Sequence, residues 1–498
     1  MTDVVDTLPT ATESTPKPGS HLFGRGMLYV VIWSLQLIAG IVVSPILAHA
    51  LPPVQFGALA SAIALYQVLS VVTLLGIDKA IVLERAENAD DRAARGLVTV
   101  AIAVALLITL AFGVTAPLWR AALGFGQFPD LVLAVILWTG PAAAVQVMLS
   151  LLLTEDRLRP FAVVSAISAV GGQVVGLVLL FTVRDDATTY AWGGVASQFV
   201  AMLIGVAVTR PRIRGLFNWR VTQRAIRLGL PLVLAGLGYF LLNAGDRIVI
   251  QSTLGQAAVA RYQVAYVVGS VVILLLTFTS SAWTPRFAGL RTRTERWALA
   301  ALSRDELYRL LMPMTLGATL AAPIALRLVA PASYHPESLT LVVFLVALSA
   351  YPVAASGATG QLLITERRGG AVGVMTAVAA LVNIGLNLLL VPAIGITGAA
   401  IATLVSFALL AFLQSRTLPT EPKLHGPSSR LVLAILASTA IAGASALLPQ
   451  TVPWNVACLA AAVCCVPWFV LALQRARRGP RESRAMLSGR RPKGKHSL

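Results

Sequence analysis

Five polar residues lie inside or at the edges of long apolar runs: Asn243, Asp246, Arg247, Arg261 and Arg327. An ionisable group deep in a bilayer costs about 2.5 to 3.5 kcal/mol, so it is expected to face a cavity or a partner. A guanidinium binds oxyanions through paired hydrogen bonds, and a diphosphate is one such anion. Asn243 lies one helical turn before Arg247, so the two side chains are predicted to share a face. We therefore predict that Arg247 binds an anionic cargo in a sheltered cavity.

The acidic residue of this group leaves two interpretations open. Adjacent helical residues point about 100° apart, so Asp246 and Arg247 are not expected to pair with each other. Asp246 either forms a structural ion pair with Arg261 across a short hairpin at residues 251–258, or faces the cavity. Arg261 is then either a neutralising partner or an additional charge in the cavity. Arg327, near the end of its apolar run, either reaches the membrane interface or joins the site.

Other residues in apolar runs are predicted to serve helix packing or gating. Asn383 and Asn387 are one turn apart, and buried amides of this kind are typical interhelical hydrogen-bond partners, although contact with sugar hydroxyls stays open. Pro352 and Gly357 interrupt a single run. A bend at such a point would let two halves of a carrier open alternately.

The sequence carries no motif for catalysis or cofactor binding. It has no GxxxxGK[ST] loop for ATP phosphates, no HExxH and no Gly-rich fingerprint. The three cysteines, Cys458, Cys464 and Cys465, lie in one apolar run without metal-ligand spacing. We expect a protein that is not an enzyme and that has neither a metal nor a cofactor.

The composition is that of an integral membrane protein. Of the 498 residues, 57% are hydrophobic and only 12% are charged, against about 25% charged in soluble domains. The 39 Lys and Arg residues outnumber the 21 Asp and Glu residues, giving a formal charge of +18. The placement of these charges favours contact with anionic membrane lipids, and nucleic acid is not an expected partner.

Fourteen apolar stretches are long enough to cross a bilayer as helices, which predicts an all-α polytopic protein. If both termini are cytoplasmic, 34 of the 39 Lys and Arg residues fall in cytoplasmic segments, as the positive-inside rule requires. We expect a multi-pass protein of the cytoplasmic membrane. The stretches are 27–50, 56–77, 96–118, 130–153, 160–183, 189–209, 228–250, 259–283, 309–330, 338–364, 371–391, 397–415, 430–449 and 454–473.

Long polar interruptions divide these spans into six, six and two. The loop from Leu51 and the loop from Leu254 occupy equivalent places in the two sets of six, which suggests parallel repeats around a central cavity. This arrangement suits a carrier. The predicted parts are a disordered cytoplasmic tail (1–26), an N-lobe (27–209), a basic cytoplasmic linker (210–227), a C-lobe (228–415), a second linker (416–429), two extra helices (430–473) and a basic cytoplasmic tail (474–498), which we expect to be disordered or to lie on the membrane.

Two stretches resemble a known family. The run GDRIVIQSTLGQAAVARYQVAYVVGSVVILLLTFTSSAWTPRF, at 245–287, and the run LVNIGLNLLLVPAIGITGAAIATLVSF, at 381–407, are similar to segments of bacterial polysaccharide-export flippases. The loop LPPVQFGALA near Leu51 is a weaker match. These flippases belong to the multidrug/oligosaccharidyl-lipid/polysaccharide exporter superfamily, whose members have two six-span lobes and sometimes two further spans.

The resemblance implies alternating-access movement of an undecaprenyl-diphosphate-linked oligosaccharide from the inner to the outer leaflet. Asp246 and Arg247 match the family's Asp-Arg pair. The second motif places Pro392 among the helix-packing or gating residues. A departure at Ala260-Arg261, where the family commonly has Gly and a small or apolar residue, leaves the role of Arg261 open. A polysaccharide polymerase and glycosyltransferases are further candidate partners.

Two other functions remain as alternatives. A cation-coupled drug or metabolite antiporter of the same superfamily would require carboxylates in the cavity. A membrane scaffold for envelope-synthesis enzymes would act through the basic tail. A polytopic glycosyltransferase is disfavoured because no sizeable polar loop is present.

Overall fold

The computed structural model describes residues 38–88, 91–290, 292–419 and 421–487, and the regular structure in these ranges is helical. Within these ranges thirteen helices are long and apolar enough to cross a membrane, and a shorter apolar helix covers Ile38–Ala50. The elements are α2 (Pro53–Leu74), α3 (Ile77–Asn88), α4 (Asp91–Trp119), α5 (Pro129–Thr154), α6 (Leu158–Ala166), η1 (Ile167–Gly171), α7 (Gly172–Thr182), α8 (Ala187–Thr209), η2 (Ile213–Phe217), α9 (Trp219–Leu254), α10 (Gln256–Gly289), α11 (Arg293–Val329), η3 (Ala332–Tyr334), η4 (Pro336–Ser338), α12 (Thr340–Leu348), α13 (Ala350–Thr365), α14 (Gly369–Ile394), α15 (Ile396–Thr417), α16 (Ser429–Leu447) and α17 (Val452–Leu487).

The predicted all-α polytopic fold is confirmed, with differences in where helices begin and end. The N-terminal part of the first predicted span, 27–37, and the predicted tail 1–26 lie outside the described residues. Several helices outrun the apolar stretches: α9 begins at Trp219, inside the predicted linker, and α17 continues to Leu487. Helical geometry therefore extends into polar sequence that hydropathy alone does not assign. The rest of the C-terminal tail, 488–498, is also outside the described residues.

Two predicted spans are interrupted within the fold. The tenth consists of α12 and α13, which meet at Ser349. A proline cannot donate to the carbonyl four residues before it, and for Pro352 that carbonyl belongs to Leu348, the last residue of α12. The fifth span contains a π-helical turn over Ile167–Gly171. Such turns are usually single insertions into an α-helix.

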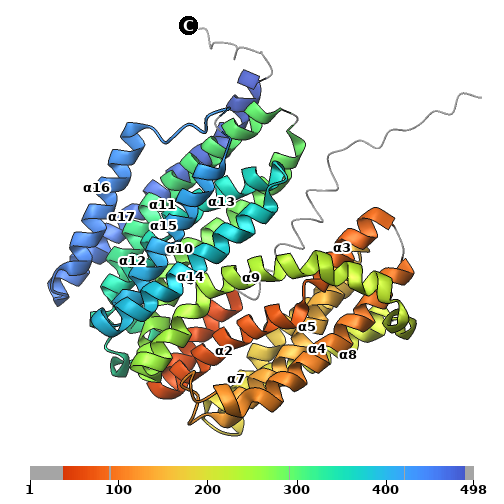
Figure 1. Cartoon of the computed structure of the whole chain (residues 1–498). Helices are drawn as coiled ribbons and strands as arrows, with labels where there is room; N and C mark the ends of the chain where they lie inside the picture. The colour runs from red at the N-terminus through yellow and green to blue at the C-terminus, as the bar shows by residue number, and fades with distance from the viewer. Residues whose placement is uncertain (1–37, 89–90, 291, 420, 488–498) are drawn as a thin grey trace, which may run out of the picture.

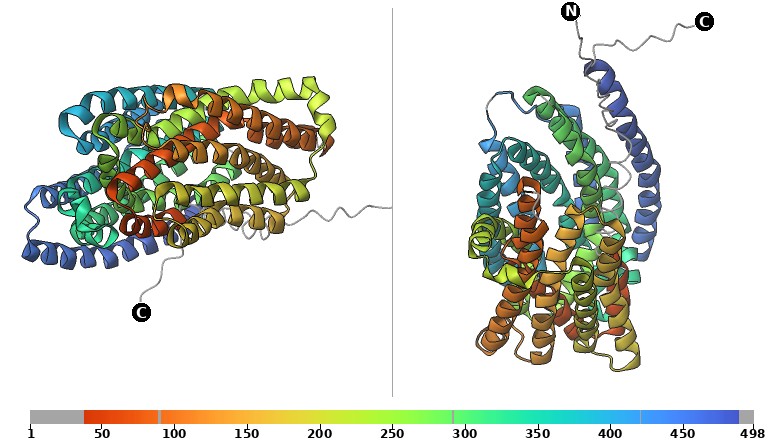
Figure 2. Two further views of the ribbon diagram at one scale, coloured as in Figure 1. Left: turned by 90° about the horizontal axis from the view of Figure 1, so that it is seen from below. Right: turned by 90° about the vertical axis from the view of Figure 1, so that its right-hand side faces the viewer.

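The helices form two bundles that are inclined to one another (Figure 1). Helices α2 to α8 make the first bundle and α10 to α15 the second, while α9 runs along the boundary between them. The α16 and α17 helices pack on the outside of the second bundle against α11. Figure 2 shows α17, in dark blue, standing along the flank of the molecule.

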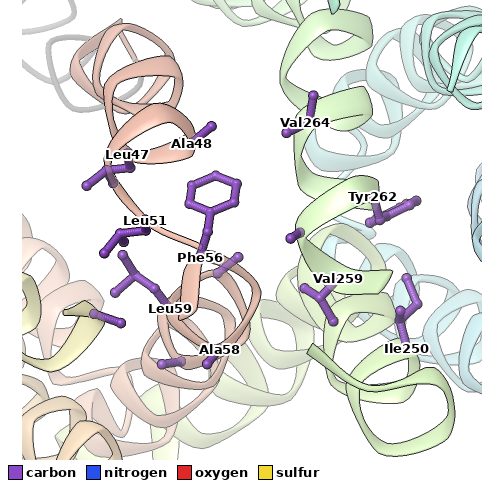
Figure 3. Close-up of a cluster of buried hydrophobic side chains, with 14 of the residues drawn as sticks. Leu47, Ala48, Leu51, Phe56, Ala58, Leu59, Ile250, Val259, Tyr262 and Val264 are labelled. Carbon is purple, nitrogen blue, oxygen red and sulfur yellow. The ribbon is translucent and has the colours of Figure 1, made fainter. Parts of the chain in front are cut away.

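The ends of the bundles differ in how closely they meet. We call the end that carries Leu51, Gly124 and Gly255 the seam end, and the opposite end, which carries Glu155 and Glu366, the basic end. At the seam end the bundles touch, and apolar side chains from the Ile38–Ala50 helix and α2 face others from α9 and α10 (Figure 3).

Polar contacts reinforce the seam. The Tyr334 hydroxyl donates to the carbonyl of Leu51 at 3.1 Å, and the side chain of Gln256 donates to the carbonyl of Gly124 at 2.9 Å. Burial raises the pKa of Tyr334, so this hydroxyl stays a neutral donor. These bonds join residues from opposite bundles.

The seam also depends on one close backbone approach. A Cβ atom added to Gly57 of α2 would lie 1.8 Å from the carbonyl oxygen of Gln256 at the start of α10. No other residue type fits there without displacing a helix. The sequence thus provides a glycine where the two bundles come closest.

The α9 helix is held from both sides. It runs antiparallel to α2, since Gly229 lies against Gly76 near one end and the carbonyl of Arg247 accepts from the Ser61 hydroxyl, at 3.4 Å, towards the other. On its other side Gly238 lies against the backbone of Ala377 in α14. The central polar residues of α9 are therefore placed between the two bundles.

Candidate functional site

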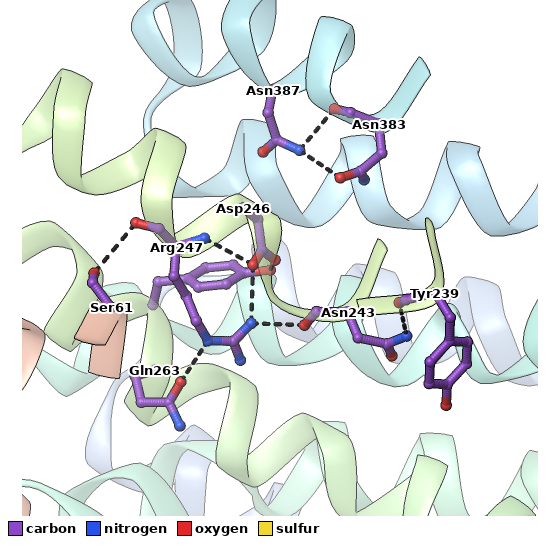
Figure 4. Close-up of polar contacts among 9 residues, drawn as sticks. Ser61, Tyr239, Asn243, Asp246, Arg247, Gln263, Asn383 and Asn387 are labelled. Atoms are coloured by element: carbon purple, nitrogen blue, oxygen red, sulfur yellow. Dashed lines mark hydrogen bonds and ion pairs between the residues drawn. The ribbon is translucent and has the colours of Figure 1, made fainter. Parts of the chain in front are cut away.

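The candidate site occupies the last three turns of α9 and the first turns of α10. Helix α9 ends at Leu254 and Gly255 reverses the chain with φ +84°, a conformation that glycine adopts readily. The predicted hairpin at 251–258 is thus reduced to a single-residue turn. This turn places the polar face of α9 directly against the first three turns of α10 (Figure 4).

Arg247 is buried, and its Nε and Nη1 donate hydrogen bonds to neighbouring residues. Its Nε donates to Oε1 of Gln263 at 2.9 Å, and its Nη1 donates to the carbonyl of Asn243 at 2.8 Å and to Oδ1 of Asp246 at 2.9 Å. The residue is 6% exposed. Asn243 contacts Arg247 through its backbone carbonyl, while its side-chain amide donates to the carbonyl of Tyr239.

The expectation that Asp246 and Arg247 do not pair is wrong. Their side chains form an ion pair at 2.9 Å, because the long arginine side chain curls back along the helix and spans the angle between neighbouring residues. The predicted ion pair between Asp246 and Arg261 is also wrong. The Nη2 of Arg261 donates to the Ser338 hydroxyl at 2.7 Å instead. Asp246 is 1% exposed, and its second oxygen accepts from the hydroxyl of Tyr262 at 2.5 Å.

Aromatic rings complete the surroundings of the pair. The guanidinium carbon of Arg247 lies 4.2 Å from the ring centre of Tyr266 and 5.6 Å from that of Tyr262. A cation over an aromatic face gains about 0.5 to 2 kcal/mol. Tyr262, Gln263 and Tyr266 were not identified in the sequence analysis. The two tyrosines could have been recognised from their spacing of four residues, which places them on one face of the helix that follows the chain reversal after Arg247.

In this conformation the pair is neutral as a unit and packed, so it is not an open cationic chamber. A pocket of about 360 Å³ lies elsewhere, at the seam end between η4, the start of α12 and the α16–α17 loop. Its lining includes Glu337, Ser338 and Gln450. The residues that line this pocket include no arginine.

Asn383 and Asn387 lie on α14, the helix that packs along α9 (Figure 4). The amide of Asn387 donates to the carbonyl of Asn383 at 2.8 Å and to its side-chain oxygen at 3.1 Å. Both residues are at most 1% exposed. Nδ2 of Asn383 and Oδ1 of Asn387 are buried and have no hydrogen-bond partner among the described residues. The two amides therefore bond to each other within one helix, and part of their capacity is unused in this conformation.

The other candidate residues lie apart from this cluster. Arg327 is exposed in the last turn of α11. Pro352 is half-buried and Gly357 exposed in α13, and Pro392 is exposed near the end of α14. Their assignment to cargo binding, packing or gating stays a prediction.

Comparison with known proteins gives a consistent picture. The sequence profile of a family described as "Polysaccharide biosynthesis protein" matches residues 24–291, more than half of the chain. Two curated proteins are similar: "Succinoglycan biosynthesis transport protein ExoT" of Rhizobium meliloti, 26% identical over 55% of this chain and 55% of that protein, and "Probable flippase AglR" of Haloferax volcanii, 28% identical over 56% of this chain and 58% of that protein. The chain thus spans a little over half the length of these relatives.

Solved structures show the same fold. A structure described as "Lipid II flippase MurJ, inward closed conformation" matches with a TM-score of 0.68 at 13% identity, over 90% of this chain and 99% of that one. An inward-facing multidrug resistance MATE family transporter of the MOP superfamily matches with a TM-score of 0.59 at 14% identity, over 84% and 98%. At these identities the likeness concerns the fold alone.

Proposed function

Because this chain belongs to the polysaccharide biosynthesis protein family, we propose that it flips a lipid-linked oligosaccharide across the cytoplasmic membrane for the synthesis of an exported or envelope polysaccharide. The cargo in this proposal carries a polyprenyl diphosphate, and it moves from the inner to the outer leaflet. The named transport and flippase relatives support the proposal. The observation that carries it is the buried arginine at the boundary of the two bundles.

The basic end faces the cytoplasm in this proposal. The positive-inside rule supports that orientation, since the segment from Arg210 to Arg227 has six arginines and no acidic residue. The two bundles then correspond to the predicted N-lobe and C-lobe, with α16 and α17 as the extra pair. The seam end is the outer end, closed in this conformation.

The Asp246–Arg247 pair provides a way to bind and release the cargo. Separating a buried ion pair costs about 3 to 5 kcal/mol because one charge is left without a partner, so we expect the contact between Asp246 and Arg247 to persist when the cargo binds. A diphosphate offers two acceptor groups to the guanidinium. Because α9 packs on both α2 and α14, a change in the angle between the bundles alters the packing around Arg247 and admits the headgroup.

The test is reconstitution of the full chain into liposomes that hold a fluorescent undecaprenyl-diphosphate-linked oligosaccharide. We expect the label to cross the bilayer without ATP, faster than in protein-free liposomes. The alternative, a cation-coupled drug or metabolite antiporter, predicts no glycan movement together with uptake of a cationic dye driven by a proton or sodium gradient. That result would overturn the proposal.

A further inference from the structure

Two turns at the basic end share a sequence pattern that the functional proposal does not use. Residues 151–157 read LLLTEDR and residues 362–368 read LLITERR, so both follow Leu-Leu-x-Thr-Glu-x-Arg. The first copy ends α5 at Thr154 and the second ends α13 at Thr365. One copy therefore lies in each bundle, at the same end.

The backbone of the two turns is also the same. Asp156 and Arg367, at the variable position before the arginine, have φ values of +50° and +60°. This left-handed conformation costs a non-glycine residue about 1 to 3 kcal/mol and persists only where surrounding contacts hold it. In both copies the N–H of the final arginine donates to the second leucine's carbonyl, at 3.0 Å from Arg157 and 2.8 Å from Arg368.

The contacts that hold the first turn come from two other helices. Glu155 accepts from Arg95, near the start of α4, at 2.8 Å. Arg157 donates to the carbonyl of Val208, near the end of α8, at 3.1 Å, and lies 3.4 Å from the Glu155 carboxylate. The turn after α5 is thus joined to both α4 and α8. The Glu155 side chain is 6% exposed.

The second turn repeats the two contacts to other helices, with equivalent elements. Glu366 accepts from Arg293, the first residue of α11. Arg368 donates to the carbonyl of Thr417, the last residue of α15, at 3.0 Å. The turn after α13 is thus joined to both α11 and α15. We call each set of contacts a clamp: Arg95, Glu155 and Arg157 in the first bundle, and Arg293, Glu366 and Arg368 in the second.

Each clamp combines interactions that are strong for physical reasons. The carboxylate–guanidinium bonds are charge-assisted, and the arginine at the end of the motif binds a helix C-terminus, where the backbone carbonyls are unpaired and the helix dipole is negative. In the first clamp Glu155 contacts both Arg95 and Arg157, so one carboxylate supports the contacts to α4 and α8. In the second, Glu366 joins the turn to α11 and Arg368 joins it to α15. The repetition of turn, backbone conformation and partners in both bundles shows that the arrangement is not an accident of one loop.

We propose that the residues of each clamp, Glu155 and Glu366 among them, are positioning residues and that each clamp as a whole fixes the basic ends of three helices as one body. Opening at the basic end then occurs between the bundles and not within them. The helices joined by the clamps, α4, α5 and α8 in one bundle and α11, α13 and α15 in the other, leave α2 and α9 to adjust along the boundary. This inference goes beyond the transport proposal and holds for any cargo.

Distances between spin labels test the clamp in the full chain, in lipid nanodiscs without cargo. After replacement of Cys458, Cys464 and Cys465, labels at the exposed Thr294 and Ser415 report the separation of α11 and α15 within one bundle. We expect one narrow distance peak in the parent chain. Glu366→Arg and Arg293→Glu should each lose that narrow peak, and the double exchange should restore it, because the pair is partly exposed and re-forms with reversed charges.

The matched control is Glu306→Gln. Glu306 pairs with Arg309 in the same helix, so it joins no second helix by that bond, and the narrow peak should remain. If the single exchanges prevent folding, Arg368→Gln takes their place, since Arg368 is exposed and its loss frees only the carbonyl of Thr417. A narrow peak retained in the single exchanges, or in Arg368→Gln where that variant is used, overturns the clamp. Cargo movement is not measured, so this result is independent of the transport proposal.

Discussion

At the scale of single residues, the buried pair of Asp246 and Arg247 determines what a substitution does. Each charge is tolerated in the membrane interior because the other is 2.9 Å away, and the hydroxyl of Tyr262 satisfies the second carboxylate oxygen. A change to one member therefore affects stability before it affects transport. Variants that remove both charges separate the two effects.

We expect Arg247→Ala to lower the free energy of unfolding by about 3 to 5 kcal/mol, because Asp246 would stay buried without a counter-ion. Combining it with Asp246→Asn should recover most of this loss. Thermal unfolding in detergent, followed by circular dichroism, measures both variants. Equal melting temperatures for Arg247→Ala and the parent chain would show that the pair contributes nothing to folding.

The sequence was sufficient to identify Asp246 and Arg247 as unusual, since charge in an apolar run is conspicuous. It was not sufficient to identify their partners. The angle of about 100° between adjacent helical residues describes the directions of their Cβ atoms. The arginine side chain is long and flexible, so its guanidinium still reaches Asp246 and the carbonyl of Asn243, one turn earlier. Tyr262 and Tyr266 become partners only through the single-residue turn at Gly255, whose tightness hydropathy does not show.

At the scale of helices, the approach of α2 to α10 at Gly57 holds the seam end together. We expect Gly57→Ala to destabilise the protein by about 1 to 3 kcal/mol, because its Cβ would overlap the Gln256 carbonyl and force the helices apart. Gly113→Ala is the matched control, since nothing lies within 4 Å of a Cβ there. Melting temperatures of the two variants test this, and a Gly57→Ala protein as stable as Gly113→Ala would contradict it.

The sequence predicts the number of membrane-spanning helices well, but not the residues at which they begin and end. Hydropathy detects the part of a helix that lipid surrounds, and α9 and α11 continue beyond it because polar turns still gain backbone hydrogen bonds. The predicted internal repeat rests on the loops from Leu51 and Leu254, which share few identical residues. The clearer repeat at 151–157 and 362–368 was visible in the sequence. A comparison of loops does not reveal it, because it lies at the ends of apolar runs rather than in a loop between them.

At the scale of the whole molecule, α16 and α17 are peripheral to the candidate site. They pack on α11 and α12, with Gly317 against Cys465 and Gly443 against Phe344. We expect a chain truncated after residue 428 to keep its transport activity at a lower melting temperature, because α9, α10 and α14 supply the candidate site. Loss of transport in a truncated chain with an unchanged melting temperature would assign the two helices a direct role.

The residue contacts and helix contacts together determine how the two bundles are arranged. The seam closes one end of the boundary between the bundles, the clamps hold three helices together at the other end of each bundle, and α9 runs between with its ion pair inside. The sequence predicted the membrane-spanning helices from composition. It did not predict that Arg247 is neutralised in this conformation, because charge pairing depends on the packing of α9 against α10.

The most direct test of the account is glycan movement by the Asp246→Asn, Arg247→Gln double variant in liposomes that carry the fluorescent undecaprenyl-diphosphate oligosaccharide. This variant removes both charges and leaves no buried charge without a counter-ion. We therefore expect it to fold, which its melting temperature checks. The account predicts that movement falls to the rate of protein-free liposomes. Movement at the parent rate in the double variant would contradict the claim that Arg247 binds the diphosphate.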